Sequence, residues 1–146
     1  MGDVLLSQSL YSFAHSLGHR PKWTKQGKAF LTEVQTEKGD AEIAVIEMNL
    51  QNKMVYTASL FPLESVQDTV RNCIKTLLLQ GNFDFTNFLI FALDEKETVW
   101  VRYNVDCSLD IEENFHKYIE ARTAVTLQID DTDVLLEKWI QRCLGK

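Results

Sequence analysis

The chain has 146 residues, of which 45% are hydrophobic and 25% charged, and its formal net charge is −6. This length suits one domain with one sizeable core, and this composition argues against a disordered chain. No apolar run approaches the roughly 20 residues of a membrane-spanning helix, so we expect no integral membrane protein. The acidic excess lies in residues 84–146, which disfavours a nucleic-acid surface there because phosphate contacts depend on lysine and arginine.

The N-terminus and the cysteines indicate a reducing compartment. The first residues, MGDVLLSQSLYSF, carry Asp3 and no early lysine or arginine, so they make a poor signal peptide and we expect a cytoplasmic protein. Three cysteines, Cys73, Cys107 and Cys143, are widely spaced and odd in number. A disulfide framework requires an even, denser set, so we interpret all three as thiols of the core.

The first half of the chain predicts a helix followed by three strands. Residues 3–17 form the helix, and Gly18 suits its end. Residues 19–28, HRPKWTKQGK, form a loop with four basic residues and no acidic one. The segments 29–36, 41–50 and 54–61 are strands, separated by the turns EKGD and QNK. The apolar face of the helix consists of Leu6, Leu10, Phe13 and Leu17.

The second half predicts a helix, a hairpin and two further helices. The helix 64–81 carries a broad apolar stripe of Val66, Val70, Cys73, Ile74, Leu77 and Leu78. Strands 87–93 and 98–105 follow, joined by an acidic turn. Asp110 suits the N-cap of a third helix, and Asp131 begins a last one. Around residues 123–130 the apolar residues fit a helix and a strand equally well.

This order, α–β–β–β–α–β–β–α with an extra C-terminal helix, predicts an α+β fold with a twisted, mostly antiparallel sheet covered by helices. The whole chain, residues 1–146, is expected to form one domain. Strand 88–93 is apolar at every position and therefore needs cover on both of its faces. The helices can cover one face. We expect a second copy of the chain to cover the other, where Trp100 lies.

Residue patterns for catalysis are weak. His15 and His19 have metal-ligand spacing, but Gly18 separates them and no third ligand is implied. Ser12 near His15 lacks an oriented third partner. Neither a G-x-G-x-x-G nor a Walker sequence is present. We therefore expect no enzyme, no cofactor and no metal, although a small enzyme with an unrecognised site stays open.

The basic segment around Trp23 is the main candidate for nucleic acid. Cations interleaved with an aromatic ring can hold a single nucleic-acid strand. We prefer the interpretation of a solvated loop whose Trp23 packs onto the core. Binding to an acidic protein surface ranks between these two interpretations. The cations are Arg20, Lys22, Lys25 and Lys28.

Two stretches carry a resemblance to a known family. They are SLFPLE, at the end of the three strands, and ESVQDTVRNCIKTLLLQGNFDFTNFLIFALDEKETVWVRYNVD. Together with the size and acidity, they resemble the class I chaperones of bacterial type III secretion, the Tir-chaperone or CesT-like group. The family pattern matches Leu78-Leu79-Gln80-Gly81-Asn82, Leu93-Asp94-Glu95 and the acidic segment 110–113. The likeness covers residues 3–125; the basic loop 20–28 and the tail 123–146 depart from it.

The resemblance implies a bacterial, cytoplasmic binding protein. Such chaperones are homodimers or heterodimers with a related chaperone, and they bind the N-terminal region of a secreted effector without ATP. By this likeness, partner binding falls to Phe13, Phe30, Leu31, Val34, Ile43 and Val45. The dimer interface falls to Val70, Ile74, Leu77, Leu78 and Trp100.

Two related functions stay open. Some chaperones of this kind also bind a transcription component, such as RNA polymerase or an activator, when cargo is absent. YbjN-like relatives share the fold without a role in secretion. The copurifying partner, an effector N-terminus or a polymerase or activator subunit, would distinguish the secretion chaperone from the transcription regulator.

Overall fold

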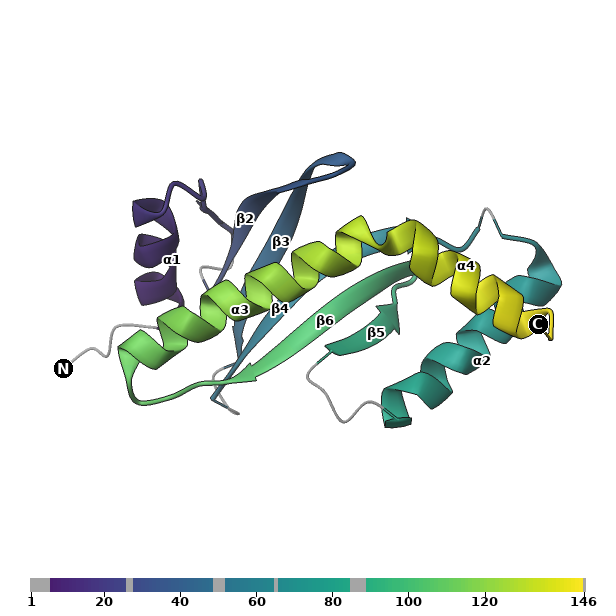
Figure 1. The fold of residues 1–146 in the computed structure, drawn as a ribbon. Helices are drawn as coiled ribbons and strands as arrows, with labels where there is room; N and C mark the ends of the chain where they lie inside the picture. Colours follow the sequence, from purple (N-terminus) through teal and green to yellow (C-terminus); the bar gives the residue numbers. More distant parts are fainter. Residues whose placement is uncertain (1–5, 26–27, 49–51, 65, 85–88, 146) are drawn as a thin grey trace.

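The computed structural model describes residues 6–25, 28–48, 52–64, 66–84 and 89–145. These residues form an α+β fold of one open, antiparallel, six-stranded sheet and four helices (Figure 1). The elements follow in the order α1 (Leu6–Ser16), β1 (Lys22–Trp23), β2 (Ala29–Thr36), β3 (Gly39–Met48), β4 (Lys53–Pro62), α2 (Asp68–Asp84), β5 (Leu89–Leu93), β6 (Thr98–Asp106), α3 (Ile111–Asp130) and α4 (Thr132–Cys143).

The predicted order of elements is confirmed, with three local differences. The basic loop contains the short strand β1, which pairs with β2. Helix α2 begins at Asp68, four residues later than expected. The ambiguous stretch 123–130 is helical, because Val125 and Ile129 continue the buried face of α3. Residues 49–50 and 87–88 of the predicted strands lie outside the described part of the chain.

The strands lie in the order β1-β2-β3-β4-β6-β5, and every neighbouring pair is antiparallel. Residues opposite one another share a face of the sheet. One face, which we call the covered face, packs against the helices in a single apolar cluster. Tyr118, Ala121 and Val125 of α3 are completely buried in this cluster. Sheet residues of the covered face include Phe30, Val45, Tyr56, Ile43, Ala58, Val101 and Phe91.

The opposite face, which we call the open face, carries apolar side chains together with polar ones such as Glu33, Glu42, Thr57, Arg102 and Asn104. None of its side chains in the described residues belongs to the cluster formed with the helices. Most of them are half-buried, although Val55 of the central strand is 4% exposed. The sheet is thus covered by helices on one side, as the sequence predicted. The apolar residues of the open face are Ala29, Leu31, Ala44, Ile46, Met48, Val55, Ile90, Ala92 and Trp100.

The turn between β5 and β6 is organised by the carboxylate of Asp94. This carboxylate accepts hydrogen bonds from the backbone N–H of Lys96 and of Thr98, both at 2.9 Å, and from Nε1 of Trp100 at 2.8 Å. These donors, the backbone of Thr98 first, lower the pKa of Asp94. The hydrogen bond from Nε1 also holds the indole of Trp100 in place on the open face.

Helix α2 is attached to the same turn by charge. The carboxylate of Glu97 accepts a hydrogen bond from Lys75 and lies 3.7 Å from the guanidinium of Arg71. The carbonyl of Glu97 accepts from the backbone N–H of Leu63 at 2.9 Å, just before α2. These contacts hold α2 beside the β5 edge of the sheet.

Cys73 and Cys143 form a disulfide between α2 and α4, with Cα atoms 5.8 Å apart. The prediction of three free thiols is therefore wrong for this pair, and only Cys107 is free. Helix packing brings together residues that are 70 positions apart, which their spacing in the sequence does not reveal. A cross-link closing a loop of this length stabilises a fold by about 4 kcal/mol in the chain-entropy treatment.

Leu78→Ala tests the packing of α2. Leu78 is 6% exposed within the core, and we expect its truncation to lower the free energy of unfolding by about 2–5 kcal/mol. Leu127→Ala, at a position of α3 that is 54% exposed, is the matched control and should change it by at most about 0.5 kcal/mol. Urea unfolding of both variants measures the difference. Equal losses would show that α2 is not part of the core.

His19 makes stability depend on pH. Its Nδ1 lies 2.9 Å from the hydroxyl of Tyr118, and burial, followed by the charge of Arg122, lowers the pKa of His19 below 6.5. Because the unfolded chain then binds more protons, this group's contribution is present above pH 6.5 and is lost as pH falls through the lowered pKa. An NMR titration, with His19→Gln to assign the signal, should give a ring pKa below 6.5. A value at or above 6.5 would contradict the burial of this ring.

Candidate functional site

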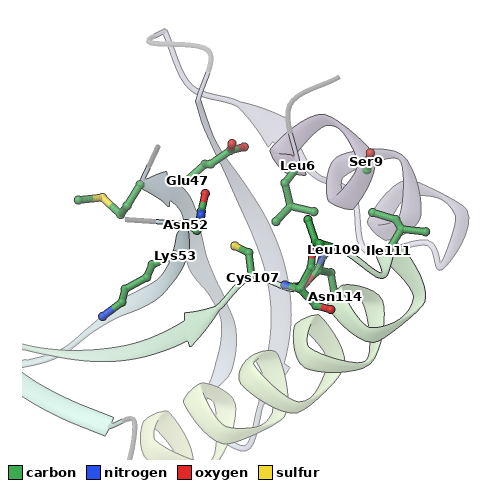
Figure 2. A pocket seen from close by; sticks show the side chains of 11 residues that line it. Leu6, Ser9, Glu47, Asn52, Lys53, Cys107, Leu109, Ile111 and Asn114 are labelled. Atoms are coloured by element: carbon green, nitrogen blue, oxygen red, sulfur yellow. Dashed lines mark hydrogen bonds between the residues drawn. The ribbon is translucent and has the colours of Figure 1, made fainter. Parts of the chain in front are cut away.

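A hollow of about 370 Å³ opens where four segments meet, as Figure 2 shows. The segments are the N-terminal part of α1, the β3–β4 hairpin, the loop after β6 and the start of α3. Both polar and apolar side chains line the hollow: Leu6, Ser9, Glu47, Met48, Asn52, Lys53, Cys107, Ser108, Leu109, Ile111 and Asn114.

The loop after β6 is held by hydrogen bonds on both sides. The amide of Asn114 exchanges two 2.8 Å hydrogen bonds with the backbone of Ser108. The backbone N–H of Cys107 donates to the carbonyl of Asn52 in the β3–β4 hairpin at 2.8 Å. Asp110 caps α3 as predicted, because its carboxylate accepts from the backbone N–H of Glu112 at 3.0 Å. The conformation of this loop is therefore well determined by local contacts.

This well-held loop presents an exposed leucine. The relative exposure of Leu109 is 108%, and its neighbours Ile111 and Met48 are 41% and 38% exposed. An apolar residue just before an N-cap commonly packs against the fourth helical residue. In α3 that residue is Asn114, whose amide is engaged with Ser108, so Leu109 has no apolar partner there. The side chain of Leu109 is therefore fully exposed to solvent at this position.

A second hollow, of about 550 Å³, continues from the first, since both are lined by Ser9 and Ile111. It lies between α1 and α3, where the rings of Phe13 and Phe115 stack with centroids 4.2 Å apart. Leu17 and Ile119 follow these rings by one helical turn and are exposed. We call this set the apolar seam. It consists of Phe13, Leu17, Leu109, Ile111, Phe115 and Ile119.

The rim of the hollows is acidic. Side chains of Asp106, Asp110, Glu112 and Glu113 surround the start of α3 and are exposed. Lys117 lies 3.4 Å from Glu113, and hydrogen bonds from Ser108 and Lys117 lower the pKa of Glu113. Lys53 lies 4.0 Å from Asp106, so the two lysines offset part of the negative charge and the rim stays acidic.

The chemical groups in the hollow suit binding. Burial, followed by the charge of Glu47, raises the pKa of the Cys107 thiol, so the thiol is protonated at neutral pH and a poor nucleophile. Among the described residues, no group of three or more His, Cys, Asp and Glu side chains is placed to hold a metal ion. His19 is engaged with Tyr118.

The structure divides the predicted partner-binding residues. Phe30, Val34, Ile43 and Val45 lie in the core, at most 3% exposed, so a bound segment does not reach them. Phe13 is half-exposed and belongs to the apolar seam, whereas Leu31 is half-exposed on the open face. A core position and a groove position have the same apolar pattern in sequence, and only packing separates them.

The predicted interface residues divide in the same way. Ile74 and Leu78 lie in the core, at most 6% exposed. Val70 and Leu77 are half-buried on α2, and Trp100 is half-buried on the open face. Their role in a dimer stays a prediction.

Trp23 of the basic segment packs onto the core, as predicted. Its ring stacks on Tyr11 at 4.7 Å and meets Phe30 edge-on at 5.9 Å. The ring is thus held by aromatic contacts within the chain.

None of the helices in the described part of the chain has the length and apolar content that a bilayer-spanning helix requires. No protein-family model and no curated protein matches the sequence. Solved structures do match. One is a chain of the ExsC–ExsE complex, with a TM-score of 0.56 and 11% identity over 88% of this chain and 95% of that chain.

A second similar structure is a chain of the HopA1–SchA chaperone–effector complex, with a TM-score of 0.50 and 13% identity over 94% of each chain. A chain of the heterodimeric ExoU–SpcU complex from the type III secretion system of Pseudomonas aeruginosa has a TM-score of 0.43 and 14% identity, over 82% of this chain and 93% of that chain. A TM-score of 0.43 is too low to support a shared fold, so the fold is assigned from the first two structures. The chain has the α+β fold of type III secretion chaperones, which the sequence resemblance predicted.

Proposed function

We propose that this protein is a cytoplasmic chaperone of bacterial type III secretion. It binds the extended N-terminal region of a secreted effector without ATP and keeps that region competent for secretion. The observation that carries the proposal is the apolar seam, in which a fully exposed Leu109 stands on a loop held by hydrogen bonds. The fold shared with a chaperone in complex with an effector supports it.

The seam suits a short amphipathic segment. Such a segment binds by placing a few apolar side chains into a groove while its polar side stays in water. The groove between α1 and α3 offers stacked rings at Phe13 and Phe115, and exposed aliphatic side chains at both ends of that stack. The acidic rim then selects a segment with basic residues beside its apolar anchors.

The sheet offers backbone groups for an extended segment. On its outer side, β2 pairs with β1 only at Phe30 and Leu31 among the described residues. Strand β5 is at the other edge and pairs with β6 alone in the described part of the sheet, but α2 lies beside it, so the β2 edge is the more accessible one. An extended chain can add to such an edge through main-chain hydrogen bonds. A segment held this way cannot collapse or aggregate.

We further propose that the protein forms a dimer through the open face. Antiparallel sheets that face water are normally polar on that side. Here Leu31, Ile46, Ile90 and Trp100 add apolar side chains to this side, between polar ones such as Thr57 and Arg102. The proposed partner in the dimer is an identical or a related chaperone chain. We propose that Val70 and Leu77 of α2 belong to the same interface.

The seam is tested by co-expression with the proteins encoded by neighbouring genes, followed by affinity purification and size exclusion without nucleotide. We expect one neighbour to copurify through its N-terminal region. Ile111→Asp or Leu109→Asp should weaken that complex more than tenfold, because burying a carboxylate against apolar groups costs well over the roughly 1.4 kcal/mol of a tenfold change.

Leu127→Asp is the matched control, since Leu127 is exposed on α3 outside the seam. It should bind as the unaltered chain does. Unchanged binding by both seam variants would remove the seam from the interface. A copurifying RNA polymerase or activator subunit, in place of an effector, would assign the protein to transcriptional regulation.

The open face is tested by Trp100→Glu. Light scattering should give twice the 16.8 kDa chain mass for the unaltered protein and the single-chain mass for the variant, because a carboxylate in an apolar interface is not solvated. Circular dichroism checks that the variant is folded, and Leu127→Glu should stay dimeric. A monomeric unaltered protein at micromolar concentration, or a folded Trp100→Glu dimer, would exclude this interface.

A further inference from the structure

Helix α4 is connected to the rest of the molecule at both of its ends. At its start, Asp131 is at once the C-cap of α3 and the N-cap of α4, and it makes no side-chain capping bond to α4. At its end, Cys143 is bonded to Cys73 of α2. Figure 1 shows α4 alongside α2 at the end of the molecule remote from α1. The disulfide is therefore the covalent link that closes α4 onto α2.

The non-covalent contacts of α4 are shallow. Its apolar side chains, Leu135, Leu136, Trp139 and Ile140, are only half-buried, and Thr132 is its one buried residue. Its ion pair to the β2–β3 turn, Lys38 to Asp133 at 3.0 Å, is exposed to solvent, and such pairs contribute little. Helices of about this length are marginal by themselves in water. The disulfide therefore adds a covalent restraint to a helix whose own apolar side chains are only half-buried.

Helix α4 covers apolar side chains of the core. The indole of Trp139 meets the ring of Phe91 edge-on at 5.3 Å and lies 5.8 Å from the ring of Phe61. Phe91 and Phe61 are 5% and 8% exposed with α4 in place. Movement of α4 away from α2 would uncover these rings and the side of α2 that carries Cys73.

We propose that Cys73 and Cys143 form a redox latch for α4. In the oxidised form the disulfide fixes α4 on α2 and over Phe61 and Phe91. In the reduced form α4 separates from α2 while the sheet, α1 and α3 keep their structure. Both cysteine residues are half-buried and neither is enclosed in the core.

The chemistry is thiol–disulfide exchange. Closing the latch converts the two thiols and one molecule of a disulfide oxidant, such as oxidised glutathione, into the Cys73–Cys143 disulfide and two reduced glutathione molecules. A dithiol reductant reverses the step. The Cys73–Cys143 disulfide is reduced to two thiols, and the two thiols of the reductant are oxidised to a cyclic disulfide. Cytoplasmic thiol pools keep most such pairs reduced, so the latch would close under oxidising conditions.

Hydrogen exchange on the full chain tests the latch in three forms: oxidised with glutathione disulfide, reduced with dithiothreitol, and Cys143→Ser. Intact mass establishes the number of free thiols in each. We expect exchange at 132–143 to be at least tenfold faster in the reduced chain and in Cys143→Ser than in the oxidised chain. In the reduced chain and in Cys143→Ser, β4 should still exchange far more slowly than 132–143, and re-oxidation should restore the protection of 132–143. Cys107→Ser is the control and should behave as the unaltered chain.

Three results would overturn the proposal. One is equal protection of 132–143 in all forms, which would mean that packing alone holds α4. Another is loss of protection in β4 together with α4, which would make the disulfide a general stabiliser of the fold. The last is failure of glutathione disulfide to remove the two thiols. None of these results depends on whether an effector binds the seam.

Discussion

The packing of α3 across one face of the sheet is the interaction on which the rest of the structure depends. Tyr118, Ala121, Val125 and Ile129 recur at helical spacing and are all buried, so one face of α3 is committed to β2, β4 and β6 along its length. With α3 in this place, the other helices can only pack beside it. The helices therefore pack on the covered face, and no helix in the described part of the chain packs on the open face.

The same constraint explains the apolar seam. Helix α1 has only 11 residues, a length at which an isolated helix is marginal, so its position depends on contacts with α3 such as the Phe13–Phe115 stack. The backbone N–H of Ser7 donates to Oε1 of Glu47 at 2.7 Å and sets the start of α1 against β3. The side chains one turn beyond the ring stack, Leu17 and Ile119, are exposed.

The sequence predicts the covered face well and the binding surface poorly, for a physical reason. The order of elements follows from local periodicity and from caps such as Asp110, whose effects act within a few residues. Leu109 was not predicted, although an apolar residue before the cap and a polar Asn114 four residues into the helix together signal it. Ile43 and Ile111 are both apolar residues in regular elements, yet one is fully buried and the other exposed, and tertiary packing decides which. The Cys73–Cys143 bond depends on packing in the same way.

The two surfaces proposed for binding lie on opposite sides of the sheet. The seam is formed by the helices of the covered side, whereas the Trp100 row belongs to the open side. Self-association through the open face would therefore leave the seam of each copy accessible, and one dimer could hold two segments or two parts of one chain. Helix α2 is attached to the β5–β6 turn through Glu97 and to α4 through the disulfide, so the latch acts at the end of the covered side remote from α1 (Figure 1). A change in the position of α4 would then uncover Phe61 and Phe91 of the covered face while the contacts between α1 and α3 stay as they are.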